Sequence, residues 1–546
     1  MSRPYIYLAI SCTTHCPFLP ACALHSAMAS QPFVISRTNI LSAIRGRIKI
    51  ATMISLLTSL YTLCAFLLAL YTLGQAVLLI TYWRTRRATV ATPDLGEAPS
   101  VAVQLPLYNE QFVAARLIDA VARFDYPRDK FLIQVLDDSD DGTVNLVARK
   151  LEALKARGFQ VQHIRRGERA SYKAGALAHG LRFCDCEYIA IFDADFLPPP
   201  HFLKATLPHL IADPRIGIVQ SRWSHLNAEA NSLTRAQKLS IDTHFLVEQT
   251  ARNRSGWLIP FNGSGGLWRR GCIEAAAGWS ADTLTEDLDL SYRAQIAGWQ
   301  SLFLPDIEVP GEIPPQLAAY KQQQARWAMG NTQCLIKLTG PIARAKLTLS
   351  QKIMAIQHLC QYLPQPLMLI LLLLTPPLLL ANSLADLPLA WLGLVGLAPP
   401  LMYLVGQMRL NDNRGALRGM RAFPALLFIG TGISLNNSLA VLAALLGIRI
   451  GFRRTPKFAD DWANNPYALP GDVSILLELI LTAYAIWAAW LAWRIQPELC
   501  PYLLIYALSF ASVAGWGIRE HRLLRRIRLL TNQKTESAGA NLPHRL

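Results

Sequence analysis

The stretch IAIFDADFLPPP (residues 189–200) ends an apolar run with two aspartates one residue apart, and three prolines follow. The run predicts a buried strand, because unbroken hydrophobic runs are typical of strands covered on both faces. Similar runs recur between residues 100 and 340 and alternate with polar helical segments: VAVQLPL, FLIQVLDDS, FQVQHIRR and IGIVQSRW. This alternation predicts an α/β domain with a mostly parallel sheet. Ligands bind beyond the carboxyl ends of such strands, so we expect the two aspartates to line a cleft.

The composition indicates a membrane protein. Of the 546 residues, 52% are hydrophobic and 16% are charged, whereas soluble domains average about 25% charged residues. The net charge of +16 comes largely from basic residues beside apolar runs, such as WRTRR at 83–87 and REHRLLRRIR at 519–528. This placement is typical of the cytosolic side of a membrane, and no motif predicts nucleic acid as a partner. The ten cysteines show no metal-binding spacing, so we interpret them as free and reduced.

Several apolar stretches are long enough to cross a bilayer, for which about 20 residues suffice. The expected organisation is a poorly structured segment at 1–52, a transmembrane helix at 53–83, an α/β domain at 95–345, a transmembrane region at 350–516 and a cytosolic basic tail at 517–546. Within the transmembrane region we predict spans at about 357–381, 388–408, 474–493 and 498–516.

Residues 424–448 are also long enough to cross, but basic loops flank them on both sides. If they crossed, one of these loops would lie outside, against the positive-inside rule. An interfacial helix keeps both loops in the cytosol, and we prefer this interpretation to a further span.

Asp193 and Asp195 form the D-x-D of the opening stretch. Two carboxylates so placed can hold a divalent cation that also contacts a diphosphate. Acids at turns are usually only solvated or capping, so the motif needs partners. Asp137 and Asp138 close the second predicted strand, where they either cap a helix or accept hydrogen bonds from a nucleoside. Lys173, in SYKAGAL, either meets a phosphate or is a solvated lysine at a helix start.

Two further motifs suit sugar transfer. Thr285-Glu286-Asp287 either forms a capping box or supplies a general base, for which we choose Asp287, with Glu286 as a second catalytic candidate. The motif Q-x-x-R-W places Gln323, Arg326 and Trp327 on one side of a helix. There Arg326 can grip a diphosphate and Trp327 can stack on a sugar ring, the alternative being an interfacial Trp-Arg pair.

Taken together in this order and followed by membrane spans, these motifs resemble those of inverting family 2 glycosyltransferases. Within that family the chain resembles the processive membrane synthases, and most closely the bacterial relatives of plant cellulose-synthase-like A proteins, the glucomannan 4-β-mannosyltransferases. The resemblance covers about residues 100–460 and includes QLPLYNE, YKAGALAHGL and NRSGWLIPFNGSGGLWRR. It implies a GT-A type nucleotide-sugar-binding domain combined with a helical multi-pass transmembrane region.

The resemblance also implies residue roles. The implied nucleotide-sugar-binding residues are Asp137, Asp138, Lys173, Asp193, Gln323 and Arg326. The implied metal ligands are Asp193 and Asp195, and the implied base is Asp287. The implied acceptor-binding residues are Phe261, Asn262, Gly263 and Trp327. Residues 452–457 (FRRTPK) resemble the gating loop of cellulose synthase, with Phe452, Thr455 and Lys457 matching and Arg454 replacing a valine.

The expected function is inverting, processive transfer from a nucleoside-diphosphate sugar, with Mg²⁺ or Mn²⁺, to a growing β-glycan. GDP-mannose is the favoured donor and UDP-glucose the next. The expected location is the inner (plasma) membrane, with the catalytic domain cytosolic and room for envelope partner subunits. The alternatives are transfer of a single sugar to a membrane lipid, as in ceramide glucosyltransferase-like enzymes, a non-enzymatic assembly subunit, and a transporter. A transporter predicts charged residues inside the spans, which hold almost none apart from Glu478.

Overall fold

The computed structural model describes residues 37–88, 90–385, 396–448, 451, 454–459, 462–470 and 474–540. The chain divides into two units, Met1–Met53 and Ile54–Leu546, and the sheet and the cleft described below belong to the second.

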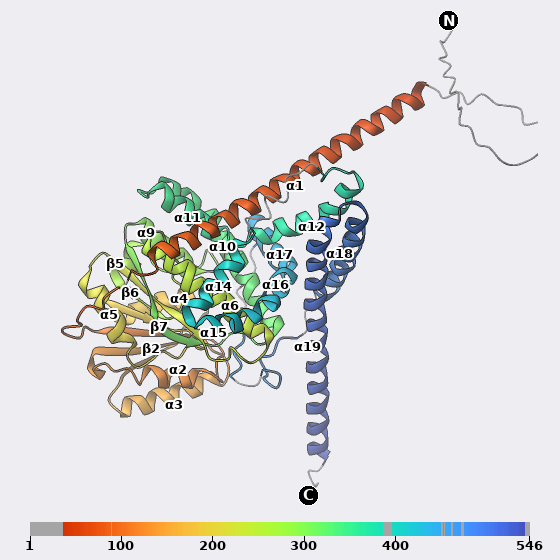
Figure 1. Cartoon of the computed structure of the whole chain (residues 1–546). Helices are drawn as coiled ribbons and strands as arrows, with labels where there is room; N and C mark the ends of the chain where they lie inside the picture. The colour runs from red at the N-terminus through yellow and green to blue at the C-terminus, as the bar shows by residue number, and fades with distance from the viewer. Residues whose placement is uncertain are drawn as a thin grey trace, which may run out of the picture. The chain divides into compact units, whose positions relative to one another are not determined.

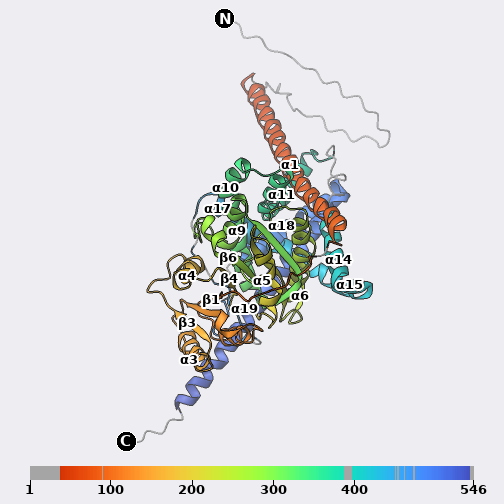
Figure 2. The same cartoon turned by 90° about the vertical axis from the view of Figure 1, so that its left-hand side faces the viewer.

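A seven-stranded sheet with the order β3-β2-β1-β4-β6-β5-β7 forms the centre of the α/β domain. Its strands are β1 (Val101–Leu107), β2 (Phe131–Asp137), β3 (Gln160–Ile164), β4 (Tyr188–Ile191), β5 (Ile216–His225), β6 (Gly266–Arg269) and β7 (Gln300–Gly311). Figure 2 shows β3, β1, β4 and β6 following one another along the sheet. β6 runs antiparallel to both β4 and β5, whereas the other neighbouring strands pair in parallel, so the sheet is mostly parallel, as predicted, with one reversed strand. β6 was not predicted, because its four residues are too few to show a periodic pattern.

Helices cover both faces of the sheet, as expected from its apolar strands (Figure 1). One face packs against α2 (Ala114–Val121), α3 (Thr143–Ala156) and α5 (Phe202–Ala212). The other packs against α4 (Tyr172–Gly180), α8 (Arg270–Ala275) and α9 (Glu286–Ile296). Val101 and Val103 of β1 point to the first face and Ala102 to the second, which is the alternation that a strand imposes. This packing leaves the carboxyl ends of the strands as the place for a site.

The helices that do not cover the sheet include the apolar ones. They are α1 (Arg37–Thr85), α6 (Ser232–Thr243), the π-helical turn η3 (His244–Gln249), α7 (Thr250–Arg254), α10 (Leu317–Arg344), α11 (Leu349–Leu359), α12 (Pro364–Leu380), α14 (Ala398–Leu410), α15 (Asn413–Gly419), α16 (Phe423–Gly432), α17 (Ser434–Leu445), α18 (Ile475–Ile495) and α19 (Cys500–Ala540). Short 3-10 turns lie at Arg128–Lys130, Leu181–Phe183, Met420–Ala422 and Pro497–Leu499.

Three helical stretches are long and apolar enough to cross a membrane: Ile48–Thr85, Ile475–Ile495 and Pro497–Leu530. Two bent pairs qualify if each counts as one span: α11 with α12, bent by 62°, and residues 413–432 with α17, bent by 45°. The predicted spans at 53–83 and 498–516 fall within the first and third of these, and the span at 474–493 begins one residue before the second. The span at 357–381 overlaps the first bent pair, and residues 424–448 contain the second bend. The span at 388–408 lies partly outside the described residues.

Two boundaries differ from expectation. α1 begins at Arg37, so residues 37–52 are helical rather than poorly structured, while residues 1–36 lie outside the described part. α19 continues through most of the predicted basic tail, to Ala540.

α10 is fixed at its start to two apolar helices. Lys321 forms an ion pair with Glu478 of α18, and both side chains are buried. The backbone N–H of Leu317 donates to Glu520 Oε1 of α19 at 2.8 Å. The helix that carries Q-x-x-R-W is therefore joined directly to candidate membrane spans.

Candidate active site

One cleft lies where β1, β2, β4 and β7 end, and it gathers most of the predicted site residues. Those that line it are Asp138, Lys173, Asp193, Asp195, Asn262, Gly263, Glu286, Asp287, Gln323, Arg326, Trp327, Thr455 and Lys457. The four motifs, spread over residues 137–327, thus meet at one place. For Asp138, Asp193 and Asp195 this convergence follows from topology, since β2 and β4 end at one edge of the sheet, while α9 and α10 bring the other two motifs to the same place.

The two aspartates of the D-x-D motif each face a lysine. Lys173 Nζ lies 2.6 Å from Asp193 Oδ1, and Lys457 Nζ lies 2.5 Å from Asp195 Oδ2. Asp195 is 5% exposed, so its charge needs a nearby cation. Burial disfavours the charged ammonium of Lys173, but Asp193 and the neighbouring Glu286 outweigh it and raise the pKa of Lys173.

Further carboxylates and cations surround Asp195. Arg454 pairs with Glu110 at 2.8 Å, and Arg116 pairs with Glu312 at 2.6 Å. Burial raises the pKa of Glu110 to about 8, although Arg454 and Lys457 oppose the shift. The loop that carries Arg454 and Lys457 therefore lies across the acidic end of the cleft.

Asp137 and Asp138 point to different places. Arg166 Nε donates to Asp138 Oδ1 at 2.9 Å, and Asp138 lines the cleft. Asp137 is buried beside His163 Nε2 at 2.8 Å and is not among the residues that line the cleft. Burial opposes the charge of Asp137, but hydrogen bonds from His163 and Ser139 outweigh it and lower the pKa of this carboxyl.

Asp287 stands in the first turn of α9, beside Glu286. Burial, and then the charge of Glu286, raise the pKa of Asp287 to about 7. A carboxylate with a pKa near the working pH suits a general base, because it is ionised often enough and still holds a proton well. Thr285 makes no side-chain capping hydrogen bond, so the capping box considered for this motif is not formed.

Two glycines allow close approaches around Asp287. Gly263 has φ +85°, and a Cβ there would lie 2.6 Å from Asp287 Oδ2. Gly330 of α10 lies against Thr285, where a Cβ would meet the Thr285 Cγ2 atom at 2.5 Å. The loop at Gly263, the start of α9 and α10 are thus packed together with no room for an extra methyl group.

The acceptor candidates separate in the structure. Asn262 and Gly263 line the cleft, whereas Phe261 is 1% exposed and packs against the ring of Trp268 at 5.2 Å between centroids. Phe261 thus supports the loop from the core and does not face the cleft. Phe452 of the gating-like loop lies outside the described residues.

Sequence reasoning did not assign several cleft residues, notably Glu110, Tyr108, Glu312, Arg169 and Trp223. Glu110 follows β1 and Glu312 follows β7, so both stand after strand ends, as Asp138 and Asp193 do. Searching the residues after every strand for acids would have found them.

The residues present fit a divalent cation only if a substrate supplies some of its ligands. Among the described residues no group of three or more His, Cys, Asp or Glu side chains forms a metal cage. Asp193 and Asp195 supply two carboxylates, and Mg²⁺ is commonly bound by one or two carboxylates plus substrate phosphates and water. The remaining ligands would therefore come from the diphosphate of the donor.

Residues 98–330 match the family described as "Glycosyltransferase like family 2". This stretch is a family 2 glycosyltransferase domain. The chain is 41% identical over 273 residues to "Probable glucomannan 4-beta-mannosyltransferase 7" of Oryza sativa subsp. japonica, covering 48% of this chain and 46% of that protein. It is 41% identical over 252 residues to "Glucomannan 4-beta-mannosyltransferase 1" of Cyamopsis tetragonoloba, covering 45% and 44%. The expected resemblance to the cellulose-synthase-like mannan synthases is confirmed.

The chain spans about half the length of the curated relatives it matches. Its fold is similar to that of a mannosyltransferase from Pyrobaculum calidifontis solved in complex with GDP-Man and Mn²⁺, with TM-score 0.51 and 23% identity. This likeness covers 71% of this chain and 100% of the other. The GT-A type fold predicted for the glycosyltransferase domain is therefore confirmed.

Proposed function

We propose that this protein is an inverting mannosyltransferase that uses GDP-mannose and Mg²⁺ or Mn²⁺ to extend a β-linked mannan at the membrane. One observation carries the proposal: the D-x-D, T-E-D and Q-x-x-R-W motifs line the same cleft, with Asp287 among them. The choice of mannose is supported by the relatives, whose names describe glucomannan 4-β-mannosyltransferases. UDP-glucose remains the second candidate donor.

The donor is held by its nucleotide and by its diphosphate. Asp138, fixed by Arg166, accepts hydrogen bonds from the nucleoside. Arg326 and Lys173 face the diphosphate from the cleft wall. When bound, a divalent cation held by Asp193 and Asp195 neutralises charge on the leaving diphosphate.

Transfer is a single displacement. An acceptor hydroxyl oxygen bonds to the anomeric carbon while the bond from that carbon to the diphosphate oxygen breaks. Asp287 accepts the hydroxyl proton, and GDP leaves with the bonding electron pair. Because attack comes from the face opposite the diphosphate, an α-linked donor gives a β-linkage.

The loop at Thr455 and Lys457 supports closure over the donor. Among the described residues, the buried hydroxyl of Thr455 finds no hydrogen-bond partner, yet it lines the cleft. A diphosphate oxygen would satisfy this hydroxyl. Lys457, now paired with Asp195, would be free to meet the same group once a cation takes its place.

The candidate spans support a polymer product that leaves through the inner membrane. The catalytic domain would lie on the cytosolic side of that membrane. Trp327 lines the cleft on α10, the helix joined to α18 and α19, so the acceptor end adjoins the apolar helices. Transfer of one sugar to a membrane lipid is the competing function, since a lipid acceptor would reach the cleft by the same side.

The test uses inverted membrane vesicles that contain the full chain, Mg²⁺ or Mn²⁺, and radiolabelled GDP-mannose or UDP-glucose in parallel. We expect label from GDP-mannose in ethanol-insoluble material that a β-mannanase releases. The Asp287→Asn protein is the control for background synthesis. If label enters only from UDP-glucose and only a β-glucanase releases it, the donor is UDP-glucose and not GDP-mannose. If label is found only in an organic-extractable lipid, the proposal of a polymer product is overturned.

A further inference from the structure

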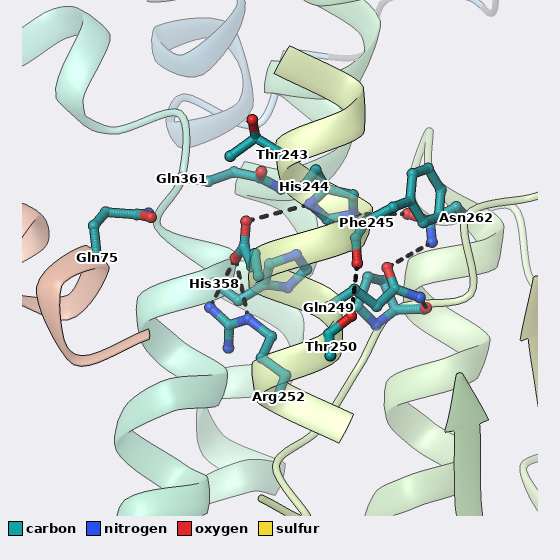
Figure 3. Close-up of polar contacts among 12 residues, drawn as sticks. Gln75, Thr243, His244, Phe245, Gln249, Thr250, Arg252, Asn262, His358 and Gln361 are labelled. Carbon is teal, nitrogen blue, oxygen red and sulfur yellow. Dashed lines mark hydrogen bonds and ion pairs between the residues drawn. The ribbon is translucent and has the colours of Figure 1, made fainter. Parts of the chain in front are cut away.

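The carboxamide of Asn262 is held from behind by the π-helical turn η3 (Figure 3). His244 Nε2 lies 3.3 Å from Asn262 Oδ1, and Asn262 Nδ2 donates to Gln249 Oε1 at 2.9 Å. The backbone N–H of Asn262 donates to Gln220 Oε1 at 2.9 Å, and the next carbonyl accepts from Lys173. Both the loop backbone and the side chain of Asn262 are therefore fixed.

The two partners also decide which way the carboxamide faces. The carbonyl oxygen of a carboxamide only accepts and its NH₂ only donates. His244 Nε2 must donate to Oδ1, and Gln249 Oε1 must accept from Nδ2. If the carboxamide turned over, the ring N–H would face an NH₂ group and the oxygen of Gln249 would face another oxygen. One orientation of Asn262 is thus selected, and with it the donor and acceptor that the cleft presents.

A second layer holds the ring of His244. Its Nδ1 lies 3.2 Å from Glu248 Oε2, and Arg252 Nε donates to Glu248 Oε1 at 3.0 Å. Arg252 is fully buried and also donates to the carbonyl of Met354 at 2.7 Å. Burial opposes the charge of Glu248, but Arg252 and His244 outweigh it and hold its pKa far below the usual range. Glu248, itself held by Arg252, thus fixes the ring of His244.

The π-helical geometry explains how His244 and Gln249 reach the same residue. In an α-helix, residues five apart point about 140° away from each other around the axis. The i to i+5 pitch of a π-turn brings them closer to one face, and such turns are frequent at functional sites. The Thr250 hydroxyl donates to the Phe245 carbonyl five residues earlier, which supports this pitch.

We infer that His244 and Gln249 are positioning residues that orient Asn262 toward a hydroxyl of the acceptor sugar. The inference rests on the proposed function, in which Asn262 lies on the acceptor side of the cleft. Gly263, the next residue, packs against Asp287 Oδ2. A correctly turned carboxamide would therefore hold the acceptor hydroxyl beside the base.

The test is a double-mutant cycle on the full-length protein in vesicles, with mannohexaose as the varied acceptor. We expect His244→Ala to raise the acceptor KM about tenfold, the size of one lost hydrogen bond. The donor KM should change less than twofold. His244→Gln, which keeps an N–H donor, should recover most of the loss. His209→Ala removes a buried histidine on α5, outside this network, and should leave both KM values unchanged.

In the Asn262→Ala background, His244→Ala should cause no further rise in acceptor KM, because its partner is already gone. Losses that multiply, or an equal rise in donor KM, would overturn the inference. The same four proteins are also melted without ligand. If His244 and Asn262 are in contact, His244→Ala should lower the unfolding temperature less in the Asn262→Ala background.

This melting cycle separates the two proposals. Absence of transfer from either donor would refute the proposed function, while the melting cycle would still report on the contact. Additive shifts in unfolding temperature would overturn the positioning role whatever the enzyme transfers.

Discussion

Gly263→Ala adds one methyl group against Asp287, the proposed base, and its effect can be worked out from the geometry. Gly263 has φ +85°, which costs an alanine about 1–2 kcal/mol of folding stability. The new Cβ would lie 2.6 Å from Asp287 Oδ2, whereas ordinary contact begins at 3.4 Å, so the carboxylate must move by about 0.8 Å. A misplacement of about 1 Å can cost about 100-fold in rate. We expect transfer to fall by about this factor.

Gly158→Ala is the matched control. Gly158 has φ +82°, and a Cβ there would meet no atom within 4 Å, so the substitution carries the same backbone cost without the contact. The assay is the initial rate of mannosyl transfer in vesicles, with unfolding temperature measured on the same two variants. Gly263→Ala should lose at least as much stability as Gly158→Ala, and only Gly263→Ala should lose transfer. Transfer by Gly263→Ala within threefold of the wild type, or an equal loss in Gly158→Ala, would refute the reasoning.

The other predictions concern the base, the acceptor and the cation. Asp287→Asn should abolish transfer while nucleotide binding, measured by calorimetry, is largely kept; retained turnover would remove Asp287 as the base. Burial and the neighbouring Glu286 raise the pKa of Asp287 to about 7. Because a general base must be ionised, the transfer rate should fall as the pH drops below about 7. A rate independent of pH from 5 to 8 would contradict the role of Asp287 as the base. Trp327→Ala should raise the acceptor KM more than the donor KM, and equal rises would indicate a structural role. EDTA should abolish transfer, and Mn²⁺ or Mg²⁺ should restore it. Lys457→Met should lower the half-saturating metal concentration, because Lys457 lies 2.5 Å from Asp195 and competes with the metal ion for this carboxylate. An unchanged half-saturating concentration would argue against this competition.

The sequence was most informative where a local pattern coincides with a strand end. Asp138, Asp193 and Asp195 follow strands that the apolar runs predict, and the parallel order of those strands brings them together. The convergence of Gln323 on the same cleft came from the family resemblance, since no periodicity relates α10 to the sheet.

The rest could not be read from the sequence for physical reasons. β6 is four residues long, and its antiparallel pairing depends on contacts far along the chain. The side of the backbone to which Asp137 and Asp138 point is set by His163 and Arg166, which lie 26 and 28 residues away. The π-turn at His244–Gln249 has no sequence signature, because it arises where one extra residue fits into a helix.

The joining of α10 to α18 has a mechanical consequence. Separating Lys321 from Glu478 would leave an uncompensated buried charge, at a cost of about 3–5 kcal/mol. A tilt of α18 should therefore drag α10 with it rather than slide past it, and Trp327 lies less than two turns further along that helix. We accordingly expect turnover to depend on lipid chain length and on the detergent used for extraction, because the surroundings of α18 would set its tilt and thereby the position of Trp327 in the cleft.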